Sequence, residues 1–381
     1  MKVTWQETES GWKYNFLEVE IAGKVKKWEW DFGDGGSGSG KTTSHAYTQP
    51  GKYTVKLTIT ADHNEKASTS VKATAFKVEL ENTNKEYVKI GKTLNIKAKV
   101  KPAGLSGGTF SWATISPTSG SGSFTSQNPT TFTATGEGCV YPQVSYTVEG
   151  STAKSTESKR ILVYVDLGPN STTTPTSNPT ITNIVDGGCQ PSKPTLEWKA
   201  YFDPSDKKWH VRVTELECTG TINISPWPKS GTPNPVPGGN VTENNYKDII
   251  ADLADYDTPG GGAGWPWHST EATRAHEEYH WYTDWLKTCI GTYWSQSETD
   301  LENLSIPEGS YCKASEAKPA LESLVNNRFN TFKTNITNKW NKEIAPKDKP
   351  GAGGGGYAAG QAVLNGIIDQ IKKLAKKSRW K

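Results

Sequence analysis

One short string, AHEEYH at residues 275–280, sets two histidines and a glutamate at a spacing that suits metal chemistry. On a helix, His276 and His280 stand four residues apart, so both imidazoles point to one side and can share one zinc ion. Glu277 lies on an adjoining face, where its carboxylate reaches a water on the metal rather than the metal itself. The spacing therefore predicts Zn2+ as cofactor, the two histidines as ligands and Glu277 as general base.

The residues around this string favour a buried helix. Residues 269–289 read as an amphipathic helix, with Ser269 as N-cap and Glu271 in the first turn. Two neutral imidazoles in a buried helix need polar partners, which favours a shared metal over two ordinary surface histidines. The aromatic residues expected to bury this helix are Trp265, Trp267, Tyr279, Trp281, Tyr282 and Trp285.

His276, Glu277 and His280 form an HExxH constellation, and the C-terminal part of the chain in this respect resembles the zincin metallopeptidases. The metzincin class is excluded, because WYTDWL follows His280 where HExxHxxGxxH would be required. Gluzincins take a glutamate from a later helix, and Glu298 and Glu302 bracket the corresponding distance. Aspzincins take an aspartate from a Gly-Thr-x-Asp string, which this region does not contain.

The sequence leaves the third metal ligand open. Asp348, in APKDKPGAGGGGY, ranks first because it is a loop carboxylate just before a glycine-rich turn that can fold back over the site. Glu302 and Glu298 rank next, although their stretch SQSETDLENLSIP reads as a loop. The remaining candidates are Glu316 and Glu322 on the next predicted helix, and His268 as a nitrogen ligand or substrate-side donor.

Two supporting roles also have candidates. Asp284, one helical turn after His280, is placed to accept a hydrogen bond from an imidazole N–H. A peptidase further needs a donor for the oxyanion that develops on the substrate. Tyr311, Tyr357 and His268 are candidates for that donor, and the sequence does not separate them.

The order of elements over residues 183–381 also resembles a family of predicted secreted bacterial zinc proteases. The shared features are a β-hairpin, HExxH, a Cys-containing loop, a long helix and a glycine-rich turn. Such relatives supply a further ligand from the glycine-rich turn. The histidine expected there is missing from this chain.

The N-terminal part carries a different signature. The stretch WEWDFGDG at residues 28–35, then Ser44, His45 and Tyr47, then GKYTVKLTIT, resembles a PKD domain over about residues 1–77. The resemblance implies an immunoglobulin-type β-sandwich that serves as a surface or secreted adhesive or spacer module. Within it, Asp31 and Asp34 are expected to form turns with local backbone amides, and His45 to be packed in a hairpin.

The same region contains GDGGSGSGKTTSHAY at residues 34–48, which fits the phosphate-loop pattern through its Gly-Lys41-Thr42 end. A phosphate loop needs a helix that begins at the lysine. Here Pro50 and Gly51 follow closely, and the apolar residues from Tyr53 onward alternate as in a strand. We therefore expect no nucleotide site.

Composition and linkers define the remaining organisation. Residues 78–166 read as a second, immunoglobulin-like β-sandwich, residues 167–182 as a Pro/Thr/Ser/Asn linker, and residues 183–381 as the zincin-like domain with a hairpin turning at residues 203–208. The expected fold class is thus multidomain, with two all-β immunoglobulin-like sandwiches followed by an α+β zincin-like domain. The Lys-rich side of the helix expected at residues 357–378 is predicted to be a solvated outer face rather than a membrane contact.

Partners and location follow from similar arguments. A net charge of +3 does not indicate a nucleic-acid partner. The sequence contains no run of eighteen apolar residues, so we expect no membrane-spanning helix. The abundance of Gly, Thr, Ser and Trp suits extracellular β-rich modules, although no signal peptide is visible at the N-terminus. The five cysteines suggest disulfides between Cys189 and Cys218 and between Cys289 and Cys312, with Cys139 left over.

Two functions from different classes fit these features. The first is a surface or secreted zinc metallopeptidase that acts on a protein or peptide. The second is a non-enzymatic surface adhesin or structural protein, in which the zinc site is structural or vestigial. In both, the β-sandwich modules are expected to contact surface polysaccharide or protein.

Overall fold

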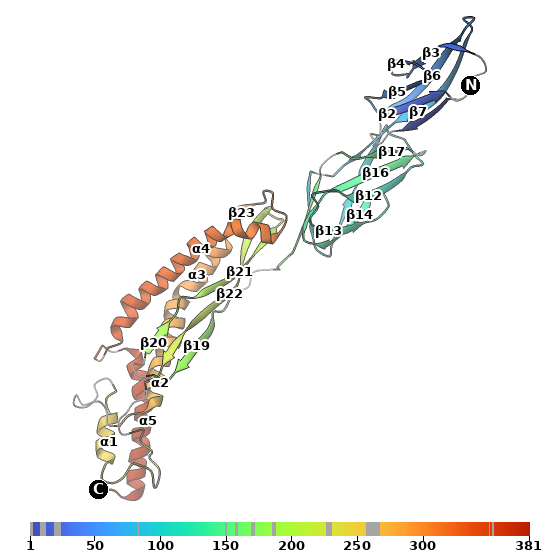
Figure 1. Ribbon diagram of the computed structural model, residues 1–381. Coiled ribbons are helices and arrows are strands. Elements are labelled where there is room, and N and C mark those ends of the chain that lie inside the picture. Colours follow the sequence, from blue (N-terminus) through green and yellow to red (C-terminus); the bar gives the residue numbers. More distant parts are fainter. Residues whose placement is uncertain are drawn as a thin grey trace. The chain divides into compact units, whose positions relative to one another are not determined.

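The computed structural model divides the chain into two compact units (Figure 1). The first unit comprises Met1–Leu167 and Ser310–Lys313, and the second comprises Gly168–Gly309 and Ala314–Lys381. The structure describes residues 3–7 and 13–18 by their backbone, and residues 24–82, 84–148, 151–156, 159–168, 172–184, 188–225, 231–256, 267–349, 351–352 and 354–381.

The first unit begins with seven strands in two antiparallel sheets, of order β1-β2-β5 and β4-β3-β6-β7. Strand β6 shows why the chain folds this way, because Val55, Leu57 and Ile59 alternate with polar residues and point into the core beside Trp30 and Phe32. The strands are β1 (Val3–Glu7), β2 (Lys13–Glu18), β3 (Val25–Asp31), β4 (Ser37–Ser39), β5 (Thr42–Ala46), β6 (Gly51–Ala61) and β7 (Lys66–Ala75).

The glycine-rich segment connects the two sheets of this sandwich. Residues 32–36 join β3 to β4, and residues 40–41 join β4 to β5, which pairs with β2, so the predicted hairpin around His45 is wrong. Strand β5 begins at Thr42, so the predicted absence of a helix after Lys41 is confirmed. The carboxylates of Asp31 and Asp34 accept hydrogen bonds from the backbone N–H groups two residues on, both at 2.9 Å, as expected for turn residues. His45 stacks on Phe32, with ring centroids 4.2 Å apart, and its Nε2 lies 2.7 Å from the Asp34 carboxylate.

A second β-sandwich follows in the same unit. Its strands form four small sheets around a core that includes Phe76, Phe132 and Tyr146. The strands are β8 (Lys77–Leu80), β9 (Lys85–Lys89), β10 (Thr93–Ile96), β11 (Ala98–Lys101), β12 (Thr109–Thr114), β13 (Ser121–Phe124), β14 (Thr130–Gly136), β15 (Gly138–Val140), β16 (Pro142–Val148), β17 (Ser151–Lys154) and β18 (Arg160–Tyr164).

The second unit has a five-stranded sheet built around the long strand β22, which pairs with all four of the other strands. Residues 176–182, predicted to belong to a linker, form β19, the parallel neighbour of β22. The hairpin between β21 and β22 turns between Asp203 and Lys208, as predicted. The strands are β19 (Thr176–Thr182), β20 (Gly188–Pro191), β21 (Thr195–Asp203), β22 (Lys208–Asn223) and β23 (Ser305–Pro307).

Helices cover this sheet and extend beyond it (Figure 1). Residues 270–302 form one continuous helical run, in which a π-helical stretch separates two α-helical stretches. The predicted loop at SQSETDLENLSIP is therefore wrong for residues 295–302, which are helical. The elements are α1 (Tyr246–Leu253), α2 (Thr270–Tyr279), η2 (His280–Ile290), α3 (Gly291–Glu302), α4 (Ala314–Lys339), η3 (Trp340–Ile344), η4 (Ala345–Lys347) and α5 (Gly355–Ser378).

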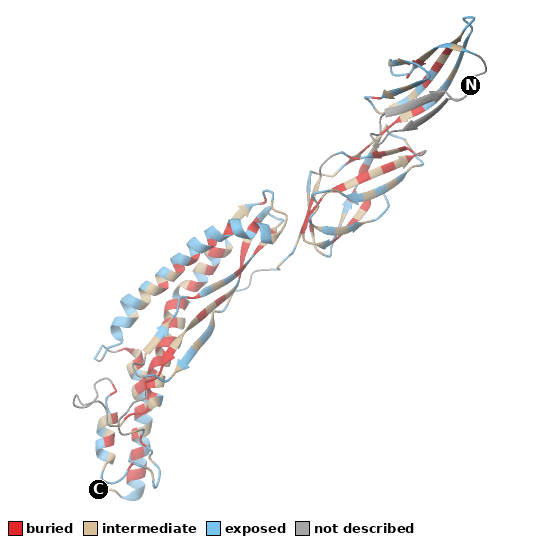
Figure 2. Cartoon of the chain, viewed as in Figure 1, coloured by how far each residue is buried: buried red, intermediate tan, exposed pale blue. Residues whose placement is uncertain are grey.

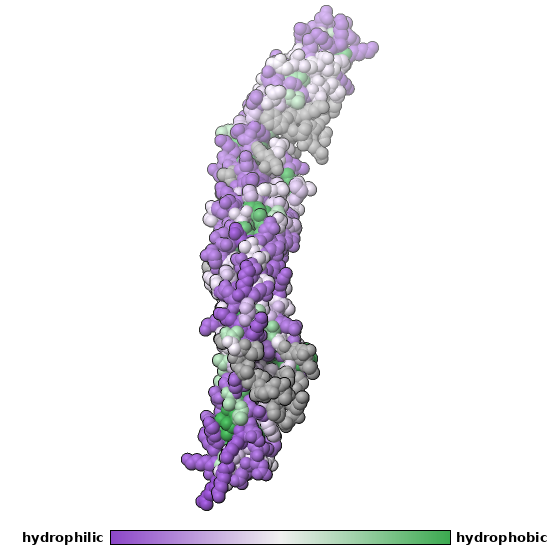
Figure 3. All heavy atoms as spheres, turned by 90° about the vertical axis from the view of Figure 1, so that its left-hand side faces the viewer, coloured by the Kyte–Doolittle hydropathy of each residue, from purple (hydrophilic) through white to green (hydrophobic). Residues whose placement is uncertain are grey.

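Burial follows the apolar periodicity of these helices (Figure 2). On α5, Leu364, Ile368, Ile371 and Leu374 are buried, whereas the lysines of its last turns are exposed, as predicted. In the part of the surface that Figure 3 colours by hydropathy, most of the visible face is hydrophilic and its apolar patches are small. No helix among the described residues is long and apolar enough to cross a membrane.

Candidate metal centre

Helix α2 brings the two histidines of the HExxH string together. Ser269 caps this helix, and its side chain accepts a hydrogen bond from the N–H of Glu271, as predicted. One turn apart, the Nε2 atoms of His276 and His280 lie 3.2 Å from each other. Both side chains are buried, so the sequence spacing produces a pair of converging imidazoles inside the fold.

Asp348 meets this pair from a distant part of the sequence. It follows the short helix η4, at the end of the helical run that starts with α4, and its N–H donates to the carbonyl of Ala345. Its Oδ1 lies 3.1 Å from the Nε2 of His276 and 3.1 Å from that of His280. Hydrogen bonds from His276 and His280 hold the pKa of the Asp348 carboxyl well below its usual range, although burial opposes them.

These three ligand atoms fit a metal ion. Their mutual separations of 3.1, 3.1 and 3.2 Å are close to the spacing of about 3.3 Å expected between tetrahedral ligands that each lie about 2.0–2.1 Å from zinc. Two imidazole nitrogens and a carboxylate oxygen are also donor types that zinc prefers. The residue set therefore suits a site with three protein ligands.

A carboxylate orients one of the imidazoles. Oδ2 of Asp284 lies 2.8 Å from Nδ1 of His280, as predicted, which directs Nε2 of His280 toward the site. Burial lowers the pKa of His280, but the hydrogen bonds to Asp284 and Asp348 outweigh it and raise the pKa to about 9. Without a metal, the carboxylates thus favour the protonated imidazole.

Glu277 lies beside the pair and is 8% exposed. Its carboxylate accepts a hydrogen bond from the N–H of Cys189 on β20, while its Oε2 is buried without a hydrogen-bond partner among the described residues. Burial raises the pKa of Glu277, and the neighbouring His276 and His280 counteract part of this effect. A buried carboxylate with a raised pKa and one unoccupied oxygen is suited to take up a proton.

Gly355 and Gly356, the first two residues of α5, allow the helix backbone to lie close to the imidazoles. A Cβ atom on Gly356 would lie 2.8 Å from Nε2 of His280 and 3.1 Å from Nδ1 of His276. A Cβ on Gly355 would collide with the ring of Tyr279. The run GGGG was a signal for this contact, because only glycine lets a helix backbone lie against the imidazoles.

The structure separates the three candidates for the oxyanion donor. Tyr357, in the first turn of α5, has its ring centroid 4.7 Å from that of His276. His268 is 1% exposed and lies against Tyr256, its Nε2 2.9 Å from Oγ1 of Thr273, while burial lowers its pKa to about 4. Tyr311 belongs to the segment that groups with the first unit. Of the three, Tyr357 is therefore the candidate in contact with a histidine of the cluster.

The alternative carboxylate ligands are engaged elsewhere. Glu298 accepts a hydrogen bond from the N–H of Thr173, at 2.6 Å. Glu302 accepts from the N–H of Val213 and pairs with Arg212, so both glutamates join α3 to neighbouring strands and loops. They lie on the order of 30 Å from His280 along the helical run, because each residue advances the axis by about 1.5 Å. Glu316 and Glu322 occupy the first turns of α4, at the opposite end from η3.

The aromatic residues predicted to bury the HExxH helix do so only in part. Trp281 and Trp285 are buried, and Trp281 donates a hydrogen bond to Ser177 on β19. Tyr282 is 50% exposed, so it does not help to bury the helix. Trp265 lies outside the described residues.

The predicted disulfides are wrong. Cys139 on β15 forms a disulfide with Cys312, and this bond lies within the first unit because Ser310–Lys313 groups with it. Cys189, Cys218 and Cys289 carry free thiols. Burial raises the pKa of all three thiols to about 12, and nearby carboxylates such as Glu277 add to this effect at Cys189.

Among the described residues, a second cluster of possible metal ligands and a pocket also lie outside the predicted site. Asp203, Asp206 and His210 cluster at the β21–β22 turn, where the imidazole and the carboxylates pair with local groups.

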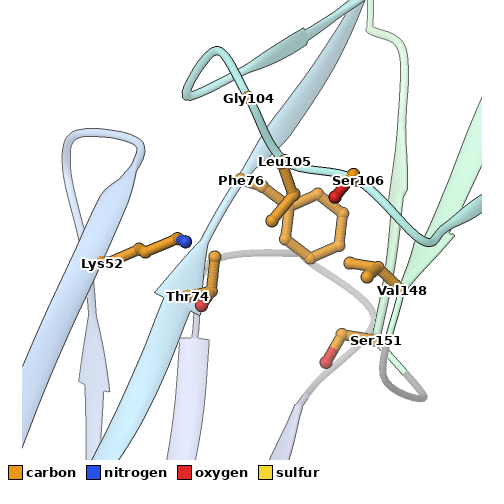
Figure 4. A pocket seen from close by; sticks show the side chains of 8 residues that line it. All are labelled: Lys52, Thr74, Phe76, Gly104, Leu105, Ser106, Val148 and Ser151. Atoms are coloured by element: carbon orange, nitrogen blue, oxygen red, sulfur yellow. The ribbon is translucent and has the colours of Figure 1, made fainter.

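A pocket of about 230 Å³ in the first unit has Phe76 beside Leu105 and Val148 (Figure 4). It is lined by Lys52, Thr74, Phe76, Gly104, Leu105, Ser106, Val148 and Ser151, none of which was predicted as a site residue.

Comparisons with known proteins identify the N-terminal part. Residues 16–76 match the PKD domain family. The PKD1 domain of Vibrio anguillarum Epp is 26% identical, covering 19% of this chain and 90% of that one, with a TM-score of 0.18. The PKD1 domain of the Vibrio cholerae metalloprotease PrtV is 21% identical, covering 19% and 91%, also with a TM-score of 0.18.

The remaining similarity concerns β-sandwich modules. Fibronectin(III)-like modules of Clostridium thermocellum CbhA are 16% identical, covering 45% of this chain and 99% of that one, with a TM-score of 0.24. No curated protein matches the chain. The match to a family model ends at residue 76, before the second unit begins at Gly168. The chain carries a PKD domain near its N-terminus, followed by an immunoglobulin-like β-sandwich and by a largely helical C-terminal region.

Proposed function

We propose that the second unit is a zinc-dependent peptidase, in which His276, His280 and Asp348 hold the ion. One observation carries this proposal: three ligand atoms 3.1–3.2 Å apart lie beside a buried glutamate that has an unpartnered oxygen. The glutamate is at the position that the HExxH pattern assigns to the general base.

The residues divide the work as follows. Zn2+, when bound, polarises the scissile carbonyl and lowers the pKa of water toward neutrality. Glu277 takes the proton of the attacking water and delivers it to the leaving amine nitrogen. Asp284 would hold His280 in the tautomer that presents Nε2 to the ion, and we assign the oxyanion donor to Tyr357, whose ring contacts His276.

The modules suggest where this chemistry takes place. PKD domains are typical of extracellular proteins, and the first unit contains two β-sandwiches. We therefore assign the protein to the cell surface or the extracellular space. Its substrate is a protein or peptide, and the sandwiches act as spacers or contact surface polysaccharide or protein.

A non-enzymatic surface protein with a structural zinc site is the second candidate. It is favoured by the depth of the imidazoles, since His276 and His280 are only 6% and 3% exposed, and by the tight contact with Gly356. Structural sites are closed, whereas catalytic sites keep a position open to substrate.

Metal analysis and a cleavage assay on the full chain distinguish the two. A peptidase contains about one zinc per chain and cleaves a quenched-fluorescence peptide library, and a chelator stops cleavage until zinc is restored. Zinc without cleavage of any library member would favour the structural role. Absence of bound zinc after equilibration with the ion would exclude both.

A further inference from the structure

The two histidines of the cluster are equivalent in the HExxH pattern but are held in different ways. Nδ1 of His280 is anchored by Asp284 at 2.8 Å. Nδ1 of His276 is buried and has no hydrogen-bond partner among the described residues. Metal-binding histidines usually donate their second ring N–H to an oriented acceptor, so the orientation of His276 needs another explanation.

Two tyrosine rings and one glycine lie close to the imidazole of His276. The ring of Tyr357 meets it edge-on, at 4.7 Å between centroids and an interplanar angle of 86°. The ring of Tyr256 lies 5.5 Å away at 36°. The backbone of Gly356 fills the space near Nδ1 and Cε1. Rotation of the imidazole about its Cβ–Cγ bond would therefore collide with one of these neighbours.

Tyr256 is itself fixed from several sides. The side-chain oxygen of Gln361 accepts a hydrogen bond from the backbone N–H of Tyr256. The side-chain nitrogen of Gln361 donates a hydrogen bond to the carbonyl of Leu253. On α5, Gly360 leaves the space that the ring occupies, since a Cβ there would lie 2.9 Å from the ring atoms. The hydroxyl of Tyr256 also hydrogen-bonds with Thr273. Tyr256 is thus a rigid surface against which His276 can rest.

We propose that Tyr256 and Tyr357 are positioning residues for the metal ligand His276, and that their rings replace the hydrogen-bond acceptor that orients His280. This inference depends on the proposed metal site but not on peptidase activity. It assigns the orienting effect to the rings rather than to the hydroxyls. Its consequence is that metal affinity depends on aromatic packing at one ligand and on a carboxylate at the other.

Metal affinity tests this division. Co2+ and Zn2+ dissociation constants of the full chain would be measured by competition with a chromophoric chelator, together with the visible absorption of bound Co2+. Tyr256→Leu and Tyr357→Leu are each expected to weaken binding about 10–100-fold and to shift the Co2+ bands, as loss of an outer-shell partner does. Tyr256→Phe and Tyr357→Phe keep the ring and are expected to bind like the wild type.

Matched controls separate orientation from loss of fold. Tyr246→Leu removes a ring from the same helical core, where it packs on Trp380, and should leave affinity unchanged. Gly360→Ala pushes the Tyr256 ring without removing it and should weaken binding. In Gly366→Ala, on the same helix, the added Cβ meets no atom within 4 Å, so this variant should bind metal like the wild type.

The outcomes are distinct. Leucine variants that are folded by circular dichroism and bind Co2+ like the wild type would overturn the inference. So would phenylalanine variants that lose as much affinity as the leucine ones, since the hydroxyls would then do the positioning. If the wild-type chain itself binds neither metal, the proposed metal site fails first, whereas a chain that binds metal but cleaves nothing leaves the inference standing.

Discussion

The glycine-rich string ending at Lys41-Thr42 and the HExxH string at residues 276–280 both match catalytic patterns, but they lie in different secondary structure. The first leads into strand β5, and the carbonyl of Gly40 accepts a hydrogen bond from the indole of Trp30. The second lies on helix α2, where its two imidazoles converge on Asp348. A phosphate loop and an HExxH site each need a helix, and only the second string has one. The element that carries a motif therefore decides whether its residues can act together.

The largest effects are expected from variants that separate the general base, Glu277, from the two metal ligands of the HExxH string. Glu277→Gln keeps the shape of the side chain and removes the base, so peptide cleavage should fall by about 10²–10⁴-fold while zinc stays bound. His276→Ala and His280→Ala should instead lose the zinc and lower the thermal midpoint. Zinc content, cleavage rate and unfolding temperature of the three variants check this. Histidine variants with full zinc and an unchanged midpoint would place the metal elsewhere.

Asp348 offers a second test, because it is the ligand that the sequence ranked first among several. Asp348→Ala should weaken zinc binding by more than the roughly 10–100-fold that outer-shell changes cause. Asp284→Asn, which alters the carboxylate behind His280, serves as the matched outer-shell control. Chelator competition measures both affinities. An Asp348→Ala protein with wild-type affinity would reduce Asp348 to a turn residue.

The metal-free protein should also show a particular dependence of stability on pH. In the folded state the pKa of His280 is raised from 6.5 to about 9, so its charged interactions with Asp284 and Asp348 stabilise the fold fully below about pH 6.5. That contribution should be lost as the pH rises through about 9. Thermal midpoints of the chelator-treated chain between pH 6 and 9.5 test this, and Asp284→Asn should flatten the curve. A midpoint that rises over this range would contradict the assignment.

The smallest effect on stability is expected from a substitution in the glycine-rich string that ends at Lys41-Thr42. Lys41→Ala should change the free energy of unfolding by less than about 0.5 kcal/mol, as is usual for exposed residues away from special contacts. Calorimetric titration of the wild type with ATP should give no binding heat. Micromolar affinity that disappears in Lys41→Ala would show that this glycine-rich segment binds nucleotide after all.

The sequence pattern predicted those features of the fold that depend on interactions between residues close together in the sequence. The period-2 strands of the sandwiches, the Ser269 cap and the i,i+4 pair of Asp284 and His280 all depend on neighbouring residues. Asp348 was ranked first only because a glycine-rich turn follows it. Its meeting with His276 is a property of the tertiary fold that the sequence suggested but did not determine.

The errors arose where tertiary contacts override local preference. Residues 295–302 are rich in Ser, Thr and Asp and read as a loop, yet Trp294, Glu298 and Leu301 are buried in the fold and stabilise a helix there. Cysteine pairing depends on distances in the fold, so proximity in sequence misassigned Cys312. Tyr256 carries no motif at all, and its place beside His276 depends on α5 leaving space at Gly360.

The disulfide between Cys139 and Cys312 makes the chain a covalent ring between these two residues. A protease that cuts one peptide bond inside this ring, for example after Leu167, opens it without releasing either piece. The β-sandwich modules and the helical region would separate on a gel only after reduction as well as cleavage. Release of the C-terminal part would thus require two chemically different events, a hydrolysis and a thiol exchange, so the protein would withstand a single nick in an oxidising environment.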